Sequence, residues 1–270
     1  MSVKPPDSPF SDEIKQRLET EIFGRTIYHF DKIDSTNRMA KDLAIEGAGE
    51  GTVIIAEEQT HGRGRLGRSW VSPLSSVLLS IILRPQVSPT QAHMITLMAG
   101  IAAAKTIRRY DIDARIKWPN DVLIDGRKVC GILTEISAAG DNINFIIIGI
   151  GINVNVDIDS FPIEIRKRST SLKAEVKKEI SRVEFVQLLL KELEDYYNLF
   201  KEQNFVALSR DWKESSDTLN RWVQVTTPNE VVEGKAIDIS QNGALIIRLR
   251  DGALKTILTG DCMHCVNGRR

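Results

Sequence analysis

The most informative stretch of this sequence reads Gly62-Arg63-Gly64-Arg65-Leu66-Gly67-Arg68-Ser69-Trp70. Its three glycines match the letter pattern of a dinucleotide-binding loop, which closes a strand and opens a helix in a βαβ unit. Here Pro73 and neighbouring serines follow the loop, and they argue against a helix start. Three guanidinium groups on a glycine-rich backbone instead suit a mobile loop that closes over anions. The simpler alternative is a solvated basic loop on the surface.

The composition is that of a globular chain without an overall charge preference. The 270 residues are 42% hydrophobic, which is enough for one large domain and a small one. Lys plus Arg and Asp plus Glu number 36 each, whereas nucleic-acid binders usually show a basic excess. There is no run of about 18 apolar residues and no apolar signal core at the start, so no membrane span is expected. A cytoplasmic location is the resulting expectation.

The three cysteines, Cys130, Cys262 and Cys265, do not suggest a disulfide scaffold, because their number is odd and small. The spacing Cys262-Met-His-Cys265 matches half of a zinc or redox site. A single Cys-x-x-Cys without a second pair is a weak signal, and plain reduced thiols are the simpler interpretation.

Residues 25–219 have the pattern of a mixed α/β domain. Residues 1–24 before it are a tail with one short amphipathic segment, Ile14 to Ile22. Alternating or buried apolar runs predict strands at residues 26–30, 52–56, 77–83, 116–118 and 143–150. An Asp125-Gly126 turn predicts a hairpin between residues 122–124 and 128–136. Helices are expected at residues 36–45, 91–109 and 182–203, the first with N-cap chemistry from Ser35-Thr36-Asn37.

The pattern changes in residues 220–270. Short apolar runs at 222–225, 231–239, 244–249 and 254–258 are separated by turn residues such as Gln241-Asn242-Gly243 and Asp251-Gly252. Their even spacing and turn chemistry predict a small β-barrel as a separate C-terminal domain.

Several catalytic motifs are absent from the sequence, which limits the reactions that the 62–70 loop could serve. There is no Gly-x-x-x-x-Gly-Lys-Ser/Thr motif, no Gly-x-Ser-x-Gly elbow and no pair of histidines at metal-binding spacing. The chain offers cations, glycines and small polar side chains instead of an obvious nucleophile or metal cage. That inventory suits a reaction based on positioning and charge neutralisation, such as nucleotidyl transfer.

A second candidate is Lys117 in the stretch Lys117-Trp118-Pro119-Asn120-Asp121. A lysine at the end of a buried strand, held by tryptophan and proline, is a fixed point charge that could hold a carboxylate and a phosphate together. The alternative is a lysine whose stem packs on Trp118 while its ammonium group lies in water.

Five ordered motifs together resemble those of the biotin–protein ligases in their monofunctional form. They are Asp34-Ser35-Thr36-Asn37, Gln59 with residues 62–70, residues 117–121, Gly131-Ile132-Leu133-Thr134-Glu135, and Gly149-Ile150-Gly151-Ile152-Asn153-Val154-Asn155. The resemblance covers residues 25–270. It implies an α+β catalytic domain of the class II synthetase type, with a mixed sheet and helices on one side, followed by a small SH3-like β-barrel.

The resemblance also implies a reaction. The family joins biotin to ATP as biotinyl-5'-AMP and then transfers biotin to a lysine of a biotin carboxyl carrier domain. ATP and Mg2+ are the expected cofactors, with the metal held by the ATP phosphates rather than by a protein cage. Lys117 and Arg65 are the expected catalytic residues, and Lys117 is the one expected to bridge the biotin carboxylate and the α-phosphate. The arginine loop would exclude water until the carrier lysine arrives.

Biotin carries a neutral ureido ring that needs both hydrogen-bond donors and acceptors. Through the resemblance, binding of biotin or its adenylate is assigned to Ser35, Thr36, Asn37, Gln59, Arg63, Gly64, Arg65, Lys117 and Gly131. Asn120 and Asn153 are expected to face the nucleotide, and Trp70 either to stack on adenine or to anchor the core. The alternative for Ser35 is a plain helix N-cap.

The expected partners follow from the same resemblance. Bifunctional family members carry an N-terminal DNA-binding domain, and the residues before position 25 are too few for one, so no DNA binding is expected. Because family members dimerise through sheet edges, a homodimer is expected, with a carboxylase carrier domain as protein substrate.

Two other functions stay open, a lipoate ligase and a non-catalytic sensor of the adenylate. The dithiolane of lipoate has no hydrogen-bonding groups, and the sequence lacks the Arg-Arg-x-x-Gly-Gly-Gly motif expected of lipoate enzymes. The presence of both Lys117 and Arg65 favours turnover over sensing.

Overall fold

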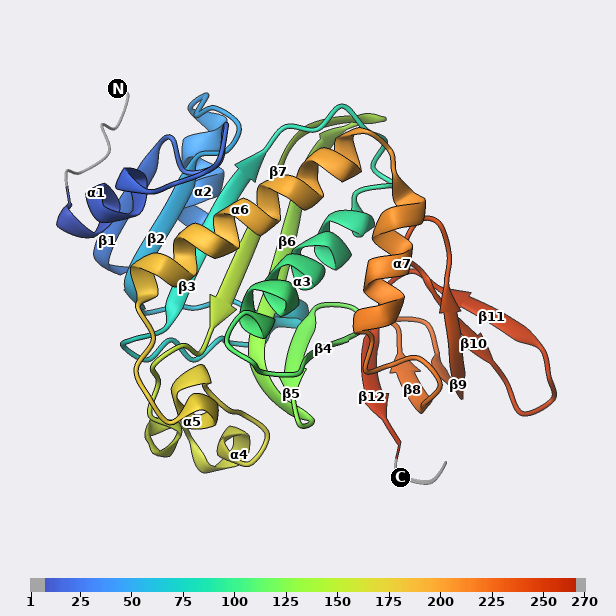
Figure 1. The fold of residues 1–270 in the computed structure, drawn as a ribbon. Coiled ribbons are helices and arrows are strands. Elements are labelled where there is room, and N and C mark those ends of the chain that lie inside the picture. The colour runs from blue at the N-terminus through green and yellow to red at the C-terminus, as the bar shows by residue number, and fades with distance from the viewer. Residues whose placement is uncertain (1–7, 266–270) are drawn as a thin grey trace.

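The computed structural model describes residues 8–265, and its centre is a seven-stranded mixed sheet (Figure 1). The strand order is β1-β2-β3-β7-β6-β5-β4, in which β1 and β2 are parallel and all other neighbours are antiparallel. The strands are β1 (Ile27–Ile33), β2 (Val53–Gln59), β3 (Val77–Leu83), β4 (Ala114–Lys117), β5 (Asp121–Ile124), β6 (Arg127–Ala139) and β7 (Asn142–Ile152). The predicted mixed sheet is thereby confirmed.

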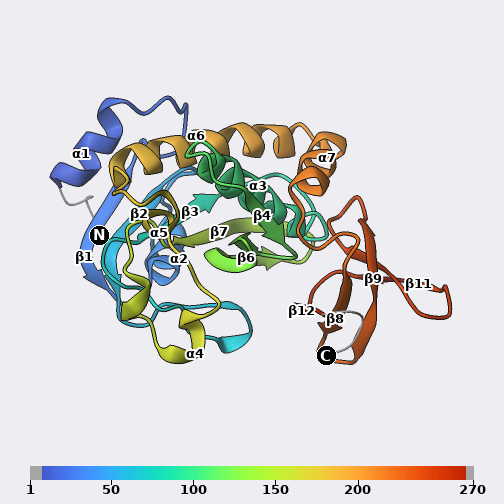
Figure 2. The ribbon, with the colours of Figure 1, turned by 60° about the horizontal axis from the view of Figure 1, so that its bottom comes forward.

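The long helices cover one face of this sheet (Figure 2). Strand residues such as Ile55, Leu79 and Ile148 form the main core with them, and α3 is buried along most of its length because it lies beneath α6. The helices of this layer are α1 (Pro9–Gln16), α3 (His93–Arg108), α6 (Arg182–Lys201) and α7 (Phe205–Ser215).

Helix α2 (Thr36–Ile45) lies on the opposite face. It packs in a second core with Ile54, Ile82 and Ile147, which alternate along their strands with residues of the main core, as the two-residue period of a strand requires. The expectation of helices on one side therefore holds for the long helices and not for α2. The connection after β7 carries η2 (Ile158–Ser160), α4 (Ile163–Arg166) and α5 (Leu172–Val176).

The C-terminal residues form a five-stranded antiparallel sheet, which confirms the predicted small β-domain. Its order is β11-β10-β9-β8-β12, with β8 (Trp222–Thr226), β9 (Val231–Ile239), β10 (Leu245–Arg248), β11 (Leu254–Ile257) and β12 (Asp261–His264). Strand β12 was not among the predicted strands. Trp118 joins the two sheets, because its backbone N–H donates to Thr218 Oγ1 at 2.9 Å and its indole Nε1 donates to the Gly243 carbonyl at 3.2 Å.

The N-terminal segment differs from the amphipathic run predicted at Ile14 to Ile22. Helix α1 already ends at Gln16, and residues 1–7 lie outside the described part of the chain. The buried carboxylate of Glu194 accepts hydrogen bonds from three successive backbone N–H groups, at residues 21, 22 and 23. In a helix that continued from α1 through Ile22, these N–H groups would donate to carbonyls four residues earlier, so their hydrogen bonds to Glu194 exclude a longer helix.

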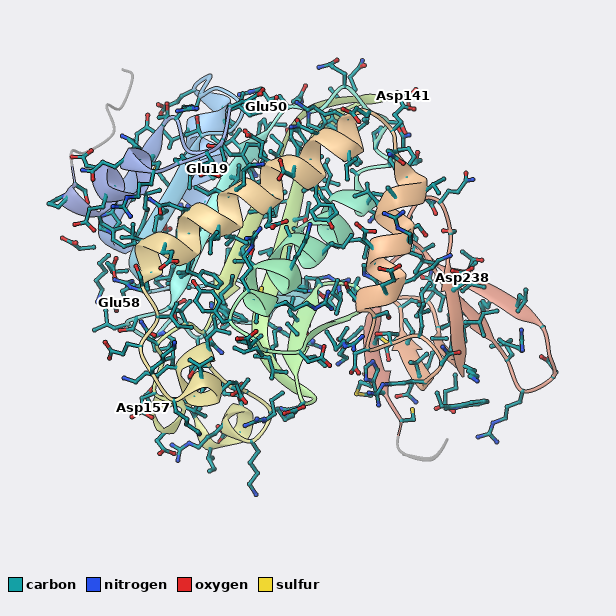
Figure 3. All side chains as sticks on the ribbon, viewed as in Figure 1. Glu19, Glu50, Glu58, Asp141, Asp157 and Asp238 are labelled. Carbon is teal, nitrogen blue, oxygen red and sulfur yellow. The ribbon has the colours of Figure 1, made fainter. Side chains whose placement is uncertain are left out.

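Charged side chains are spread over the outside of the molecule. The labelled acids Glu19, Asp141 and Asp157 lie at widely separated points in Figure 3. Among residues 8–265, no helix is both long enough and apolar enough to cross a membrane.

Candidate active site

A cavity of about 120 Å3 opens on the α2 face of the sheet. Its walls come from the start of α2, the 62–70 loop, the strands β5, β6 and β7, and the first residue of β12. The volume is small beside the roughly 300–1,000 Å3 of typical small-molecule sites, and residues of the 62–70 loop line part of it. The predicted site residues that line it are Ser35, Thr36, Asn37, Gln59, Arg63, Gly64, Arg65, Trp70, Asn120 and Gly131.

Neutral polar groups form one side of the cavity. The backbone N–H and the hydroxyl of Thr36 donate to Gln59 Oε1 at 2.8 and 3.1 Å, and Gln59 Nε2 donates to Ser72 Oγ at 3.1 Å. Asn37 Nδ2 donates to the Glu135 carboxylate at 2.8 Å. This network presents donors and acceptors without net charge at Thr36 and Asn37, where each side chain is almost fully buried.

Ser35 occupies the N-cap position of α2, yet its side chain makes no capping hydrogen bond. Its hydroxyl lines the cavity, and the side chain makes no hydrogen bond to any of residues 8–265. The plain N-cap alternative therefore fails for this side chain, and the hydroxyl is free to contact a ligand.

The 62–70 loop folds back on itself as a small hairpin around η1 (Arg65–Gly67). Gly64 N–H donates to the Arg68 carbonyl at 2.7 Å, and Trp70 N–H donates to the Gly62 carbonyl at 2.9 Å. Gly67 has φ +73°, and a Cβ at Gly62 would lie 2.4 Å from the Trp70 carbonyl oxygen, so both positions need glycine. No helix follows the loop, which excludes the dinucleotide fingerprint.

Two arginines of the loop form ion pairs with carboxylates. Arg63 Nη1 lies 3.1 Å from Glu135 Oε1, and Arg68 makes a two-pronged contact with Asp261, the first residue of β12. The hydrogen bond from Arg68, opposed by burial, holds the pKa of Asp261 below its usual value.

Arg65 connects the loop to both sheets. Its Nη1 donates to Asn120 Oδ1 at 2.9 Å, and its Nη2 donates to Thr259 Oγ1 at 3.1 Å and to the Gly260 carbonyl at 3.2 Å. Asn120 is fixed in turn, because its Nδ2 donates to the Ile132 carbonyl at 2.9 Å. Asn120 thus orients Arg65 at the edge of the cavity.

Trp70 forms a wall of the cavity by packing on bare backbone. Gly131 and Gly151 are paired across β6 and β7, and a Cβ at either position would lie within 2.6–2.7 Å of the indole. The Nζ of Lys128 lies 5.3 Å from the centroid of the indole ring. The backbone at Gly131 is therefore closely approached by the ring of Trp70, whereas the sequence predicted close approach by the ligand.

Lys128 was not predicted as a site residue, and it is the one lysine among residues 8–265 that lines the cavity. Its Nζ lies 2.6 Å from Asp121 Oδ1, which also faces the cavity. The residue sits at the start of β6, just before the motif that begins at Gly131.

Lys117 and Asn153 do not line the cavity, which corrects their expected position. Lys117 ends β4, the edge strand of the sheet, and its positive charge acts on residues of β12 instead. Asn153 is buried, and its Nδ2 donates to the Thr170 carbonyl at 2.9 Å, so it fixes the connection after β7.

The Cys-x-x-Cys spacing does not form a metal centre in the described part of the chain, where no group of three potential His, Cys, Asp or Glu ligands occurs. Cys262 is buried in β12, and burial raises the pKa of its thiol to about 12. A thiol with that pKa stays protonated at neutral pH.

Residues 29–153 match the family model described as the Biotin/lipoate A/B protein ligase family. Residues 218–264 match the model described as the Biotin protein ligase C terminal domain. Fold and site thus define a ligase of the biotin and lipoate type.

Individual relatives distinguish between the biotin and the lipoate ligases. The chain is 35% identical over 261 residues to the bifunctional ligase/repressor BirA of Bacillus subtilis, spanning 96% of this chain and 80% of that protein. It is 31% identical to the biotin–[acetyl-CoA-carboxylase] ligase of Paracoccus denitrificans, over 80% of this chain and 92% of the relative. The solved biotin protein ligase of Aquifex aeolicus in complex with biotin and ATP matches with a TM-score of 0.77 and 29% identity, over 89% of this chain and 99% of that one. The chain belongs to the biotin protein ligase family.

Proposed function

We propose that this enzyme forms biotinyl-5'-AMP from biotin and ATP and then transfers biotin to a lysine of a biotin carboxyl carrier domain. The observation that carries the proposal is one cavity that joins a neutral polar network to a lysine and three arginines. The neutral polar network suits the ureido ring of biotin. The lysine and the arginines suit a carboxylate that approaches phosphates. The solved relative that holds biotin and ATP supports the same pair of small substrates.

Biotin recognition is assigned to the start of α2 and to the end of β2. The free hydroxyl of Ser35 and the bound groups of Thr36, Asn37 and Gln59 surround the polar part of the cavity. A ureido ring can exchange hydrogen bonds with such groups, whereas an apolar dithiolane would leave them unpaired.

In the first step, a biotin carboxylate oxygen attacks the α-phosphorus of ATP. A P–O bond forms, the bond between the α-phosphorus and the bridging oxygen breaks, and pyrophosphate leaves. Both reactants are anionic, so the site must supply positive charge where they meet. We assign this role to Lys128 in place of Lys117, because its ammonium group faces the cavity beside the Trp70 wall.

The chemistry of the donors in the cavity fits Mg2+, which would be bound there together with ATP. The carboxylates of Asp121 and Asp261 both line the cavity, and carboxylate oxygens are ligands that Mg2+ accepts alongside phosphates. When bound, the metal ion would offset phosphate charge.

In the second step, the amine of the carrier lysine attacks the carbonyl carbon of the mixed anhydride. A C–N bond forms, the C–O bond to AMP breaks, and the amine loses a proton. No enzyme nucleophile is needed, but water must be kept from the anhydride until the carrier arrives. We assign this task to the 62–70 loop, with Arg63 and Arg65 turned toward the adenylate and Trp70 beside the nucleotide.

The test is incubation of the protein with ATP, Mg2+, a carrier domain and either biotin or lipoate. Transfer of biotin supports the proposal, and transfer of lipoate alone contradicts it. Adenylate formation without transfer would indicate a sensor. The homodimer and the absence of DNA binding stay predictions, which sedimentation and DNA-binding assays can check.

A further inference from the structure

Ser80 is a buried polar side chain that lies behind the cavity wall. It sits in the middle of β3, a strand whose seven residues are all buried, and its own exposed fraction is 0%. Its other strand neighbours are aliphatic, and Ser80 does not line the cavity. A hydroxyl in such a place is costly to bury unless it is hydrogen-bonded within the protein.

The hydrogen bonds of Ser80 reach two of the residues assigned to biotin. Its Oγ lies 2.8 Å from Thr36 Oγ1 and 2.7 Å from Asn37 Oδ1. Thr36 uses its own hydroxyl proton toward Gln59 Oε1, so the single hydroxyl proton of Ser80 is shared between Thr36 Oγ1 and Asn37 Oδ1. Ser80, which is the most deeply buried of these side chains, is therefore the donor.

The amide of Asn37 has a single orientation for the same reason. Its Nδ2 faces the Glu135 carboxylate at 2.8 Å, and a carboxylate only accepts hydrogen bonds. Its Oδ1 consequently faces the hydroxyl of Ser80. Gly149 pairs with Ser80 across β3 and β7, and a Cβ there would lie 1.9 Å from Asn37 Oδ1. The amide thus rests on bare backbone while Ser80 holds its oxygen.

We propose that Ser80 is a positioning residue for recognition of the ureido ring, acting through Asn37 and Thr36 without touching biotin. This inference rests on the proposed function. Without the Ser80 hydroxyl, the buried Asn37 oxygen loses its donor, and both side chains are free to rotate. The site then loses the fixed donor and acceptor pattern by which it distinguishes a ureido ring from an apolar one.

The main experiment compares Ser80→Ala with Ser76→Ala in steady-state adenylation, followed by pyrophosphate release. Ser76 is a matched control, since its hydroxyl is also buried, next to the same strand, and has no hydrogen-bond partner. We expect Ser80→Ala to raise the KM for biotin about tenfold, which corresponds to one to two lost hydrogen bonds. The KM for ATP and the kcat at saturating biotin should stay within about twofold of wild type. Ser76→Ala should match wild type throughout.

A second comparison separates positioning from a merely structural role. In an Asn37→Ala background, Ser80→Ala should change the biotin KM by less than about threefold, because the group it positions is gone. Ser80→Cys roughly keeps the side-chain volume and weakens the hydrogen-bond donor. If Ser80→Ala lowers the melting temperature, the same KM measurements are made on Ser80→Cys.

The possible results distinguish the role of Ser80 from the ligase function itself. An unchanged biotin KM in Ser80→Ala and Ser80→Cys, or full additivity with Asn37→Ala, overturns the role of Ser80 while the ligase function stands. A wild-type protein that forms no biotinyl-5'-AMP overturns both.

Discussion

Lys128 illustrates at the residue scale how one extra residue in a strand redirects a side chain. Simple alternation along β6 would put Lys128 on the same face as Cys130 and Ile132, which belong to the main core. The pairing of β5 with β6 shifts register between Val122 and Leu123, so Val129 and Cys130 both face the core. This β-bulge turns Lys128 to the open face, where the cavity lies.

Replacement of Lys128 tests which lysine serves adenylation. We expect Lys128→Ala to slow pyrophosphate release from biotin and ATP by about 100-fold or more, because a charge beside the reacting anions is lost. Lys117→Ala is the matched control, as it removes a lysine outside the cavity, and it should retain activity within about threefold. The reverse ranking of the two variants would return the role to Lys117.

The residues that could be predicted from the sequence are those whose role depends on local motifs. Ser35, Thr36 and Asn37 share one helix start, and the loop arginines share one turn, so neither group depends on long-range register. The choice between Lys117 and Lys128 depends on strand order and on a bulge, which no short pattern encodes. Ser80 was missed because a serine within an apolar run does not interrupt a strand prediction.

At the scale of elements, the 62–70 loop is bound on two sides. Arg63 contacts β6 through Glu135, while Arg65 and Arg68 contact the segment from Thr259 to Asp261 of the C-terminal domain. The loop can therefore open over the cavity only by releasing contacts with both sheets.

We predict graded effects of loop variants on adenylate retention. Arg65→Ala should release biotinyl-5'-AMP about tenfold faster, because Arg65 is half-buried and makes three hydrogen bonds. Arg68→Ala should have only about a two- to threefold effect, because its pair with Asp261 is largely solvent-exposed. Stopped-flow measurement of release, with Arg210→Ala as a surface control, checks the order. Wild-type release from Arg65→Ala would exclude the loop as a lid.

The observed bounds of β3 and α2 agree with the bounds predicted from their patterns of apolar residues. Strand β12 could not be recognised, because Cys262, Met263 and His264 lack the alternation of a strand and match a metal motif by letter. It forms because β8 offers an antiparallel edge to residues 261–264.

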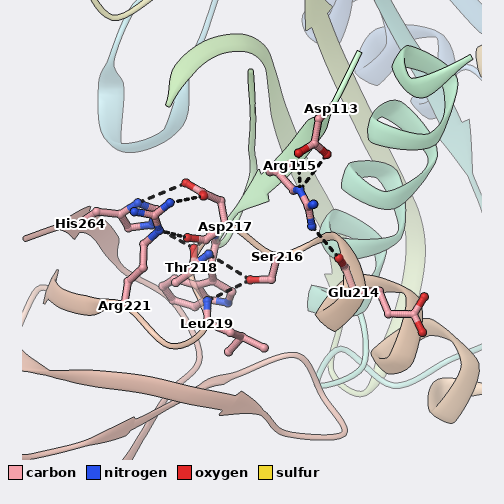
Figure 4. A network of polar contacts seen from close by, with 10 residues as sticks. Asp113, Arg115, Glu214, Ser216, Asp217, Thr218, Leu219, Arg221 and His264 are labelled. Carbon is pink, nitrogen blue, oxygen red and sulfur yellow. Dashed lines mark hydrogen bonds and ion pairs between the residues drawn. The ribbon is translucent and has the colours of Figure 1, made fainter. Parts of the chain in front are cut away.

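At the scale of the whole molecule, the two sheets meet at a short polar junction (Figure 4). Ser216 Oγ accepts hydrogen bonds from the backbone N–H groups of Thr218 and Leu219, both at 3.1 Å. Arg115 of β4 donates to the Glu214 carbonyl at the end of α7 at 3.1 Å. These contacts fix the direction in which the chain enters β8.

His264 makes this junction sensitive to acid. Burial, together with the nearby charge of Lys117, lowers the pKa of His264 to about 4, although Asp217 opposes the shift. The unfolded chain therefore binds the proton first, and stability is lost as pH falls from about 6.5 to about 4. We expect a loss of about 3 kcal/mol across this range, and His264→Gln should flatten that part of the curve in urea unfolding. An equal slope in the variant would contradict this assignment.

The Glu194 anchor is a separate test of global stability. Glu194→Ala leaves three buried or half-buried backbone N–H groups without their acceptor, so we expect a loss of about 3 kcal/mol. Hydrogen exchange should accelerate at residues 21–23 before it does in the central sheet. Glu202→Ala, at an exposed site just after α6, is the control and should change stability by less than about 0.5 kcal/mol.

The paired arginines of the loop have a consequence for product release. Arg63, Arg65 and Arg68 each have an acceptor inside the protein, so an incoming phosphate competes with an existing partner for the positive charge. The same acceptors compete for these arginines once pyrophosphate has formed. A free anion without the biotin or adenosine part gains little from that exchange, so we expect inorganic phosphate to inhibit weakly and pyrophosphate to leave readily.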